Sequence, residues 1–349
     1  MRKIFFHNAI NEAMFLAMRH DKKVIAYGLG ISDPKSIFGT TSGLKEEFGE
    51  ERVFDMPIAE NAMTGMAVGA AISGYKPVLV HQRLDFALLS LDQIVNSAAK
   101  WFYMFGGKTP VPIVIRMIVG RGWGQGPTHS QALHAWFSHI PGLKVVLPSN
   151  PSDAKGLLLE SINDPNPVIF IEHRWLHNTL GFVSDDYFRV ALGSANIKIR
   201  GKDITILSFS LMTIEAIIAT KFLKKYGISC EVVDLRTIRP IDWKTIIRSV
   251  KKTTKLLVLD ISQKTGSISG ELVSRICEDH FSCLSHPPVR IASPDHAVPT
   301  SFGLTKNFYP NAKNIINEVS KIFSIEIKSK YQDNKFPHDI PGDWFKGPF

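Results

Sequence analysis

The stretch Asp55-Met-Pro-Ile-Ala-Glu-Asn-Ala-Met-Thr-Gly-Met-Ala-Val-Gly-Ala-Ala-Ile-Ser-Gly74 decides the fold of this 349-residue chain. It follows a predicted strand and continues as a helix rich in small residues. Gly65, Gly69 and Gly74 predict that another backbone approaches this helix closely. Glu60 stands at the helix start, where backbone N–H groups and the helix dipole stabilise a carboxylate. On this stretch alone, a capping role for Glu60 is favoured over a chemical one.

The length and composition indicate a globular protein with two domains. The chain is 44% hydrophobic and 21% charged, which is typical of a packed protein rather than a disordered one. The longest apolar run, Val111 to Gly120, is interrupted by Arg116 and is too short to span a membrane. Asn11 and Glu12 interrupt the apolar core that a signal peptide would need. A cytoplasmic location is therefore expected, without a membrane partner.

The cysteines and the net charge exclude other classes. Three cysteines without CxxC spacing argue against a disulfide framework and against a zinc site. The net charge is +9, but Lys and Arg are scattered and form no basic block interleaved with aromatics. We therefore expect no nucleic-acid partner. The positive charge instead indicates attraction to anionic metabolites or to an acidic partner subunit.

Short apolar strands alternate with helices, which predicts an α/β fold of two domains, each a mainly parallel sheet covered by helices. An amphipathic helix is predicted at residues 4–20. The expected domains are residues 1–190 and 204–324, with a linker at 191–203 and a tail at 325–349. The predicted strands are 24–27, 52–55, 76–81, 111–117, 144–147 and 168–172 in the first domain, and 204–210, 229–234, 255–260 and 289–292 in the second.

Two glycine-containing segments follow predicted strands. Gly28-Leu29-Gly30 is a lone Gly-x-Gly with Asp33 at the place of a third glycine, so a nicotinamide site is rejected. The second segment, from Gly120 to Gly126, contains four glycines in seven residues and predicts a mobile loop. This loop is expected to end at a helix start near His129.

With these residues in place, the chain resembles the beta subunit of the thiamine-diphosphate-dependent decarboxylase component of 2-oxoacid dehydrogenase complexes, in the transketolase superfamily. The resemblance covers residues 4 to 323. It implies a transketolase pyrimidine-binding domain followed by a transketolase C-terminal domain. The motifs that carry it are Ile58-Ala59-Glu60, Ala67-Val68-Gly69-Ala70-Ala71, Asp92-Gln93-Ile94-Val95-Asn96-Ser97-Ala98-Ala99-Lys100, Thr128-His129-Ser130-Gln131, Pro141-Gly142-Leu143-Lys144-Val145-Val146, Asp153-Ala154-Lys155-Gly156-Leu157 and Val233-Asp234-Leu235-Arg236-Thr237-Ile238-Arg239-Pro240.

The resemblance implies roles for three residues. Glu60 would hydrogen-bond a pyrimidine ring nitrogen of thiamine diphosphate and stabilise its protonated form, so that the exocyclic nitrogen can take a proton from the thiazolium carbon. Phe86 would stack on the pyrimidine, although core packing is the better interpretation of this residue alone. His129 would lie near the substrate carboxylate or the acyl intermediate, although a lone histidine at a helix start is more often a cap.

The same resemblance implies ions and partners. A potassium ion is expected against backbone carbonyl groups at Ser161, Asp164 and Asn166, where an ordinary helix-ending turn fits equally well. The chain contains no Gly-Asp-Gly motif, which in this superfamily opens the magnesium and diphosphate site. We therefore expect an alpha subunit that supplies the diphosphate half and holds the magnesium, in an alpha2beta2 assembly. A lipoyl acyltransferase core is a further expected partner.

The chain departs from the family around the expected substrate pocket. Gly28-Leu29-Gly30 replaces a pair of acids, which puts in doubt their proton path between paired active sites. His81 and Arg83 stand where the family has apolar and small residues, and Arg83 could clamp a carboxylate or phosphate. A solvated strand end with a local ion pair is an equal alternative. Arg121 and Trp123 in the glycine loop also suit a polar substrate.

The main functional prediction is a pyruvate dehydrogenase-like beta subunit, active only with an alpha subunit. The pair would decarboxylate a 2-oxoacid and transfer the acyl unit to a lipoyl group. The alternative is a carboligase or transketolase-like subunit that uses an aldehyde, ketone or sugar acceptor. A third hypothesis is a non-catalytic scaffold, which the presence of Glu60, Phe86 and His129 makes less favoured.

Overall fold

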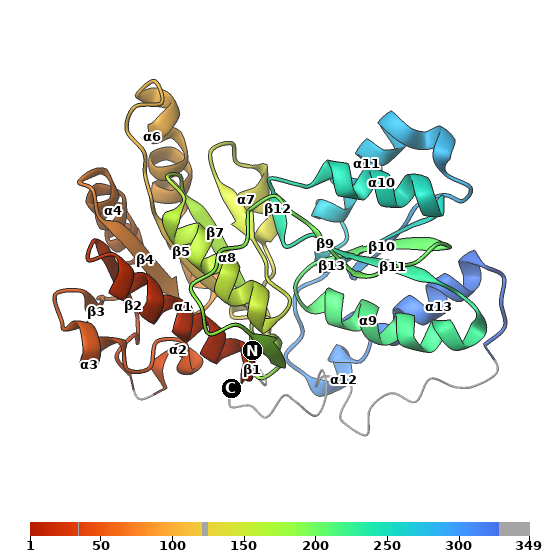
Figure 1. The fold of residues 1–349 in the computed structure, drawn as a ribbon, viewed down its shortest axis with the longest axis horizontal. Helices are drawn as coiled ribbons and strands as arrows, with labels where there is room; N and C mark the ends of the chain where they lie inside the picture. The colour runs from red at the N-terminus through yellow and green to blue at the C-terminus, as the bar shows by residue number, and fades with distance from the viewer. Residues whose placement is uncertain (34, 121–124, 328–349) are drawn as a thin grey trace.

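Two α/β domains lie side by side in the computed structural model, which describes residues 1–33, 35–120 and 125–327 (Figure 1). Each domain has its own sheet, and helices cover both faces of that sheet. In both sheets most neighbouring strands run parallel. The predicted fold class is therefore confirmed.

The first domain is built on a seven-stranded sheet of order β12-β6-β7-β5-β4-β2-β3. All neighbours are parallel except β12, which joins β6 antiparallel from the second half of the chain. Its strands are β2 (Val24–Gly28), β3 (Val53–Asp55), β4 (Lys76–His81), β5 (Val114–Val119), β6 (Lys144–Val146), β7 (Val168–His173) and β12 (Thr237–Arg239). Its helices are α1 (Phe6–His20), α2 (Ser36–Gly39), α3 (Leu44–Phe48), α4 (Glu60–Ile72), α5 (Leu84–Ala87), η1 (Leu88–Ser90), η2 (Gln93–Ala98), α6 (Ala99–Met104), η3 (Gly126–Thr128), α7 (His134–His139), α8 (Pro151–Asn163) and η4 (Arg174–Leu176).

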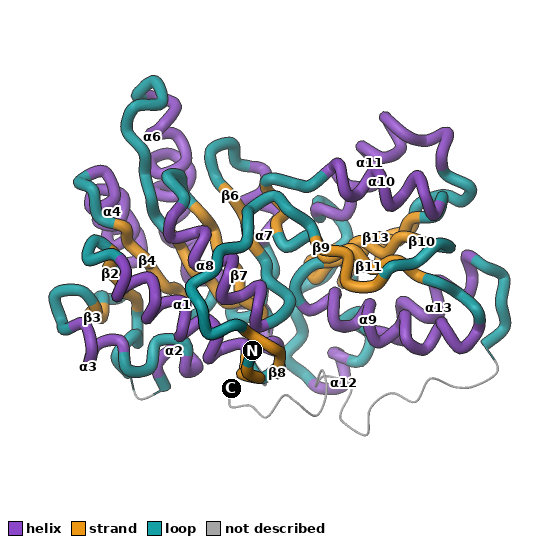
Figure 2. The backbone as a smooth tube through the Cα atoms, viewed as in Figure 1, coloured by secondary structure: helices purple, strands orange, loops and turns teal. Residues whose placement is uncertain are grey.

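The second domain has a five-stranded sheet of order β14-β13-β10-β11-β9. Figure 2 shows its strands between α10 and α11 on one side and α9 and α13 on the other. Its strands are β9 (Asn196–Ile199), β10 (Ile204–Ser208), β11 (Cys230–Asp234), β13 (Leu256–Gln263) and β14 (Val289–Ser293). Its helices are α9 (Leu211–Leu223), η5 (Lys224–Tyr226), α10 (Trp243–Thr253), α11 (Ile268–His280), η6 (Phe281–Cys283), α12 (Phe302–Thr305) and α13 (Ala312–Ile322).

The hydrophobic core is continuous between the domains. One cluster of buried apolar residues contains members of α4 such as Val68, inner strand residues such as Ile115, and residues of the second domain such as Leu207 and Val258. The opposite face of the first sheet packs on α1 and α8, and the opposite face of the second sheet packs on α9 and α13. The shared cluster fixes the two domains against each other, because apolar surface buried in it belongs to both.

The small-residue helix predicted from the deciding stretch is α4. At Gly65 an added Cβ would lie 3.3 Å from the side-chain oxygen of Gln93, so a side chain approaches this glycine and not the backbone that was predicted. At Gly69 nothing lies within 4 Å, and the predicted approach is wrong within this chain because this side of α4 is exposed. Gly74 has a φ of +93° and forms the turn after the helix.

Several predicted connections carry strands instead. Residues 2–5 form β1 (Arg2–Phe5) before α1 begins, and they pair antiparallel with β8 (Leu180–Val183). The residues expected as the linker, 191–203, contain β9, which pairs antiparallel with β11. All four residues of β9 are half-buried, so the strand lacks the alternation of buried and exposed residues on which the prediction relied.

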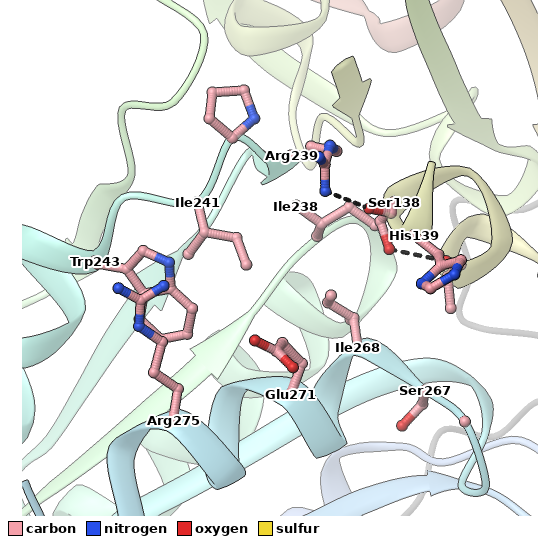
Figure 3. A pocket seen from close by; sticks show the side chains of 13 residues that line it. Ser138, His139, Ile238, Arg239, Ile241, Trp243, Ser267, Ile268, Glu271 and Arg275 are labelled. Atoms are coloured by element: carbon pink, nitrogen blue, oxygen red, sulfur yellow. Dashed lines mark hydrogen bonds between the residues drawn. The ribbon is translucent and has the colours of Figure 1, made fainter. Parts of the chain in front are cut away.

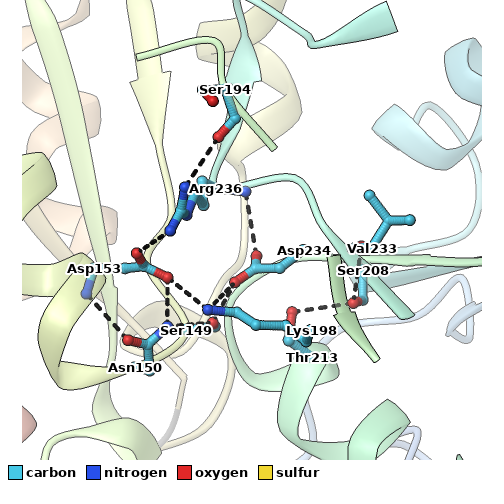
Figure 4. A network of polar contacts seen from close by, with 10 residues as sticks. All are labelled: Ser149, Asn150, Asp153, Ser194, Lys198, Ser208, Thr213, Val233, Asp234 and Arg236. Atoms are coloured by element: carbon cyan, nitrogen blue, oxygen red, sulfur yellow. Dashed lines mark hydrogen bonds and ion pairs between the residues drawn. The ribbon is translucent and has the colours of Figure 1, made fainter. Parts of the chain in front are cut away.

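A polar network joins the domains beside this core (Figure 4). The carboxylate of Asp153, on α8, accepts hydrogen bonds from Lys198 at 2.8 Å and from Arg236 at 2.5 Å. Asp234, at the end of β11, accepts a hydrogen bond from the hydroxyl of Ser149 at 2.5 Å. Burial alone would raise the pKa of Asp153, but the charges of Lys198 and Arg236 outweigh it and lower that pKa.

Within the ranges described above, no helix has both the length and the apolar character that crossing a membrane requires.

We predict that Asp153→Ala lowers the free energy of unfolding by about 3 kcal/mol, because it leaves two largely buried cations without their carboxylate. Urea denaturation of the full chain measures this change. The control is Asp185→Ala, which removes an exposed ion pair with Arg2 and should change stability by less than about 1 kcal/mol. Equal effects of the two substitutions would contradict the assigned role of the network.

Candidate active site

The candidate site lies at one edge of the first sheet. Because β2, β3, β4, β5 and β7 are parallel, their carboxyl ends meet at this edge, where α/β proteins commonly bind ligands. The segments that leave these strands carry the predicted residues. Glu60 follows β3, Arg83 and Phe86 follow β4, and His129 follows β5.

Glu60 is the first residue of α4 and is only 5% exposed. Its side chain makes no hydrogen bond or ion pair with any residue that the structure describes. The N-cap position is held by Ala59, and Glu60 lies in the first turn of α4, where the helix dipole stabilises its charge. Thr64, one turn further along α4, is fully buried, and its hydroxyl also lacks a partner among the described residues. Neither carboxylate oxygen of Glu60 is among the fully buried atoms without a partner, so both can still accept hydrogen bonds from a ligand.

Phe86 and His129 are brought together. Their ring centroids lie 5.4 Å apart, and the ring planes are nearly perpendicular at 87°. Nδ1 of His129 lies 3.0 Å from the hydroxyl oxygen of Thr128, and the side-chain amide of Gln131 donates to Asp85 at 2.7 Å. These contacts tie the segment around His129 to the segment that carries Phe86.

The sequence predicted that His129 lies at a helix start, and this prediction is wrong. His129 follows the short helix η3, and the next helix, α7, begins at His134. The intervening residues 129–133 belong to no helix. The glycines and the proline that precede them disfavour a longer helix, and only the short turn η3 forms there. The imidazole is half-buried and lies on a loop rather than on a rigid helix.

Arg83 is buried rather than solvated. Its side chain is 2% exposed, and Nη1 donates to the carbonyl oxygen of Gly120 at 3.1 Å. Its guanidinium carbon lies 5.3 Å from the ring centroid of Phe38. Burial lowers the pKa of Arg83 to about 10, so the group stays charged at neutral pH. The alternative of a solvated strand end with a local ion pair is therefore wrong.

His81 is also buried, but apart from this cluster. His81 is 1% exposed, and neither ring nitrogen has a hydrogen-bond partner in the part of the chain that is described. Burial lowers the pKa of His81 to about 4. The imidazole is therefore neutral at physiological pH, and it forms no hydrogen bond with Arg83 or Glu60.

The other predicted pocket residues, Arg121 and Trp123, lie outside the described residues. The residues predicted to bind potassium lie at the end of α8 and in the turn that follows. There the carboxylate of Asp164 accepts from the backbone N–H of Asn166 at 2.9 Å and pairs with Lys144, while Ser161 donates to a helix carbonyl at 2.7 Å. These contacts do not involve the backbone carbonyl groups expected to bind the ion, so potassium stays a prediction. Among the described residues, no cluster of three His, Cys, Asp or Glu side chains could hold a metal.

A buried ionic group behind the edge was missed from the sequence. Glu172, on β7, accepts from Arg116 at 2.7 Å and lies 3.1 Å from Nε2 of His177. Although burial alone would raise it, the charge of Arg116 and the hydrogen bond to His177 lower the pKa of Glu172 to about 2. Burial lowers the pKa of His173, at the end of β7, to about 3. The available signal was the arginine that interrupts the apolar run from 111 to 120.

A second missed pair joins the domains. Nε2 of His134 lies 2.9 Å from the carboxylate of Asp260, at the carboxyl half of β13, and both side chains are fully buried. His134 follows directly on the segment that carries His129, so the pair fixes one end of that segment to the second domain. Sequence spacing gave no signal, since the two residues are 126 positions apart.

A separate cavity lies away from these residues (Figure 3). It has a volume of about 540 Å³ and runs between the domains, lined by α7, β12 and the start of α11. None of the predicted site residues lines it. Arg275 lies over the ring of Trp243 at 4.4 Å on its wall. Its size therefore does not identify the site, which is assigned from the unpartnered carboxylate and the sheet edge.

Comparison with known proteins identifies the family of each domain. Residues 2–178 match the family Transketolase, pyrimidine binding domain, and residues 193–315 match Transketolase, C-terminal domain. Pyruvate dehydrogenase E1 component subunit beta of Rhizobium meliloti is 39% identical over 323 residues, which cover 92% of this chain and 70% of the relative. Acetoin:2,6-dichlorophenolindophenol oxidoreductase subunit beta of Bacillus subtilis is 38% identical over 328 residues, covering 90% and 96%.

A solved structure named Split gene transketolase, inactive beta4 tetramer, has a TM-score of 0.75 and 21% identity, and the match covers 93% of this chain and 99% of that one. Fold and site thus define a two-domain protein of the transketolase type with a pyrimidine-binding domain. The chain belongs, within that class, to the family of beta subunits that includes those of pyruvate dehydrogenase E1 components. The resemblance predicted from the sequence is confirmed.

We predict that His81→Leu weakens the pH dependence of stability. Below about pH 6.5 the unfolded chain gains a proton on His81, whereas the folded chain gains it only near pH 4, so this histidine makes the protein less stable as pH falls. The slope of unfolding free energy against pH should fall by up to about 1.4 kcal/mol per pH unit in that window. Urea denaturation at a series of pH values measures it.

The control is His20→Leu, because His20 is exposed and its imidazole meets solvent in both the folded and the unfolded chain. This variant should keep the wild-type slope. A His81→Leu slope equal to that of the wild type would contradict the prediction, because it would show that His81 binds a proton equally well in the folded and the unfolded chain.

Proposed function

We propose that this chain is the beta half of a thiamine-diphosphate-dependent enzyme, which decarboxylates a 2-oxoacid and passes the acyl unit to a lipoyl group. The observation that carries the proposal is the buried carboxylate of Glu60, which has no partner among the described residues. Two of the relatives named above support the reaction class, since their names are those of a pyruvate dehydrogenase subunit and an acetoin oxidoreductase subunit.

The residues of the site fit the aminopyrimidine end of that cofactor. Glu60 offers a carboxylate that can accept a hydrogen bond from a protonated ring nitrogen, and no cation in the described part of the chain forms an ion pair with it. Phe86 is half-buried, so part of its ring remains available to stack on a flat heterocycle. When bound, thiamine diphosphate supplies the electron sink for the loss of carbon dioxide.

The chain's own residues then have separate tasks. Glu60 would hold a proton at the pyrimidine nitrogen, which a neutral amide could not do as well. Phe86 would orient the ring. His129, beside Phe86 at 5.4 Å, would donate a hydrogen bond to the substrate carboxylate or to the acyl oxygen. Its place on a loop would let it move as substrate enters.

The site needs a partner to be complete. Large apolar side chains are exposed beside it: Ile58 is 78% exposed two residues before Glu60, and Leu89 is 65% exposed three residues after Phe86. Met66, on the outer side of α4, is 43% exposed. We propose that an alpha subunit covers this surface, supplies the diphosphate half with its magnesium, and forms an alpha2beta2 assembly. A lipoyl acyltransferase core and a potassium ion at Ser161, Asp164 and Asn166 belong to the same proposal.

The carboligase alternative gains no support from these relatives, whose names describe dehydrogenase and oxidoreductase subunits. Acceptor-dependent product formation without lipoamide reduction by the reconstituted pair would favour it. A non-catalytic scaffold is disfavoured by the partnerless state of Glu60, because a scaffold gains nothing from a buried unpaired carboxylate.

We predict that Glu60→Gln lowers the turnover of the reconstituted alpha and beta pair by about a hundredfold or more, without lowering the stability of the chain. The amide keeps the size of the side chain but cannot balance the charge of a protonated ring. Lipoamide reduction with a 2-oxoacid measures turnover, and thermal unfolding measures stability.

The matched control is Glu46→Gln, since Glu46 is an exposed acid in the first turn of another helix, α3. It removes the same charge from a helix start and should leave turnover within about twofold of the wild type. Full turnover in Glu60→Gln would overturn the proposed function.

A further inference from the structure

Arg83 is a buried cation with donor capacity that the chain does not use. One of its nitrogen atoms, Nη1, donates to the carbonyl of Gly120, while Nη2 is buried and has no partner among the described residues. The nearest acid whose charge affects it, Asp85, accepts from Gln131 and forms no ion pair with Arg83 within the described chain. A buried guanidinium in this state has lost its water without gaining a counter-ion.

Two other arginines have acceptors or a counter-ion that Arg83 lacks. Arg52 also lies over a phenylalanine, Phe48, at 5.0 Å, but it donates to the carbonyl oxygens of Met18, Asp21 and Val24. Arg116 is fully buried and also keeps two unpartnered nitrogen atoms among the described residues, but the carboxylate of Glu172, 2.7 Å from its Nε, neutralises its charge. Arg83 has neither three carbonyl acceptors nor a carboxylate.

A second guanidinium lies on the same aromatic ring. The ring centroid of Phe38 is 5.3 Å from the guanidinium carbon of Arg83 and 4.4 Å from that of Arg174. Burial first, and then the charge of Arg83, lower the pKa of Arg174 to about 10. His173 and His177 are neutral here, because burial lowers their pKa values to about 3 and about 4. Two guanidinium groups therefore share the ring of Phe38.

Gly120, whose carbonyl oxygen accepts the hydrogen bond from Arg83, also borders a small cavity. Gly120, His173 and Ser130 line part of a space of about 30 Å³ between the domains. Ser130 is 5% exposed, and its hydroxyl has no partner among the described residues. At Gly120 an added Cβ would lie 2.4 Å from the ring of His173, so only glycine leaves this arrangement intact. The space admits a terminal group of a few atoms but not a whole substrate.

We infer that Arg83 anchors an oxyanion, a carboxylate or phosphate, carried by the substrate in addition to its 2-oxoacid carboxylate. The inference rests on the proposed function for the substrate class, but the binding of an oxyanion does not depend on it. A guanidinium pairs with both oxyanions through parallel hydrogen bonds, and Nη2 offers the unused donors. The preferred substrate is thus a 2-oxoacid with a second negative group, and Arg83 is a specificity-determining residue.

The first test measures anion binding by the full chain without turnover. Inorganic phosphate and malonate are titrated into the wild type, Arg83→Gln and Arg19→Gln by calorimetry. Arg19 is the matched control, because it also lies over a phenylalanine, at 5.3 Å, but is exposed and paired with Glu47. We expect Arg83→Gln to weaken binding of at least one probe about tenfold or more, and Arg19→Gln to leave it unchanged. The probe that binds identifies the oxyanion.

Equal binding by the wild type and Arg83→Gln, or no binding of either probe by the wild type, would overturn the inference. The variant Arg83→Lys tests whether any loss of binding comes from a folding defect. It keeps the charge and should retain part of the binding, and its thermal unfolding shows whether the chain is intact. Loss of binding in a folded Gln variant with partial retention in the Lys variant supports the anchor.

The second test uses the reconstituted alpha and beta pair. The ratio of kcat/KM for 2-oxoglutarate to that for pyruvate should fall about tenfold in Arg83→Gln, mainly through KM for the doubly charged substrate. If malonate fails to bind and phosphate binds, the same comparison is made with a phosphorylated 2-oxoacid. If the reconstituted alpha and beta pair is inactive with every 2-oxoacid, the proposed function is wrong. The calorimetry would still test whether Arg83 binds an oxyanion.

Discussion

The burial of Glu60 without a partner is the constraint from which the remaining features follow. The residue is 5% exposed at the first turn of α4, and none of the described residues bonds to it. Its carboxylate can therefore accept hydrogen bonds from a ligand. Parallel strands bring Phe86 and His129 to the same edge, and the core shared by the two domains keeps that edge in place.

Buried charges in this protein fall into two kinds. Asp153, with Lys198 and Arg236, is fully paired, and the network fastens one domain to the other. Glu60 and Arg83 keep unused hydrogen-bonding capacity at the carboxyl edge of the first sheet. Paired groups stabilise the fold, whereas unused ones lower its stability and are retained where binding needs them. Neither Glu60 nor Arg83 lines the cavity of about 540 Å³, so their assignment as candidate functional residues does not depend on that cavity.

Much of the fold was predictable because its signals are local. Continuous apolar strands, small residues in α4 and the carboxylate at its start all lie within short windows of sequence. Features that depend on distant partners were not predictable. The short strands β9 and β12 exist because β11 and β6 offer them edges, and His134 meets Asp260 across the domain boundary. The interpretation of Arg83 as solvated failed for the same reason, since its burial depends on Phe38 and Gly120.

The measurement that tests the central claim most directly is a structure of the chain with its alpha partner and thiamine diphosphate bound. We expect a carboxylate oxygen of Glu60 within about 2.6–3.2 Å of a pyrimidine ring nitrogen, with Phe86 against the face of that ring. A pyrimidine ring held elsewhere, with Glu60 bonded to a protein group instead, would contradict the account.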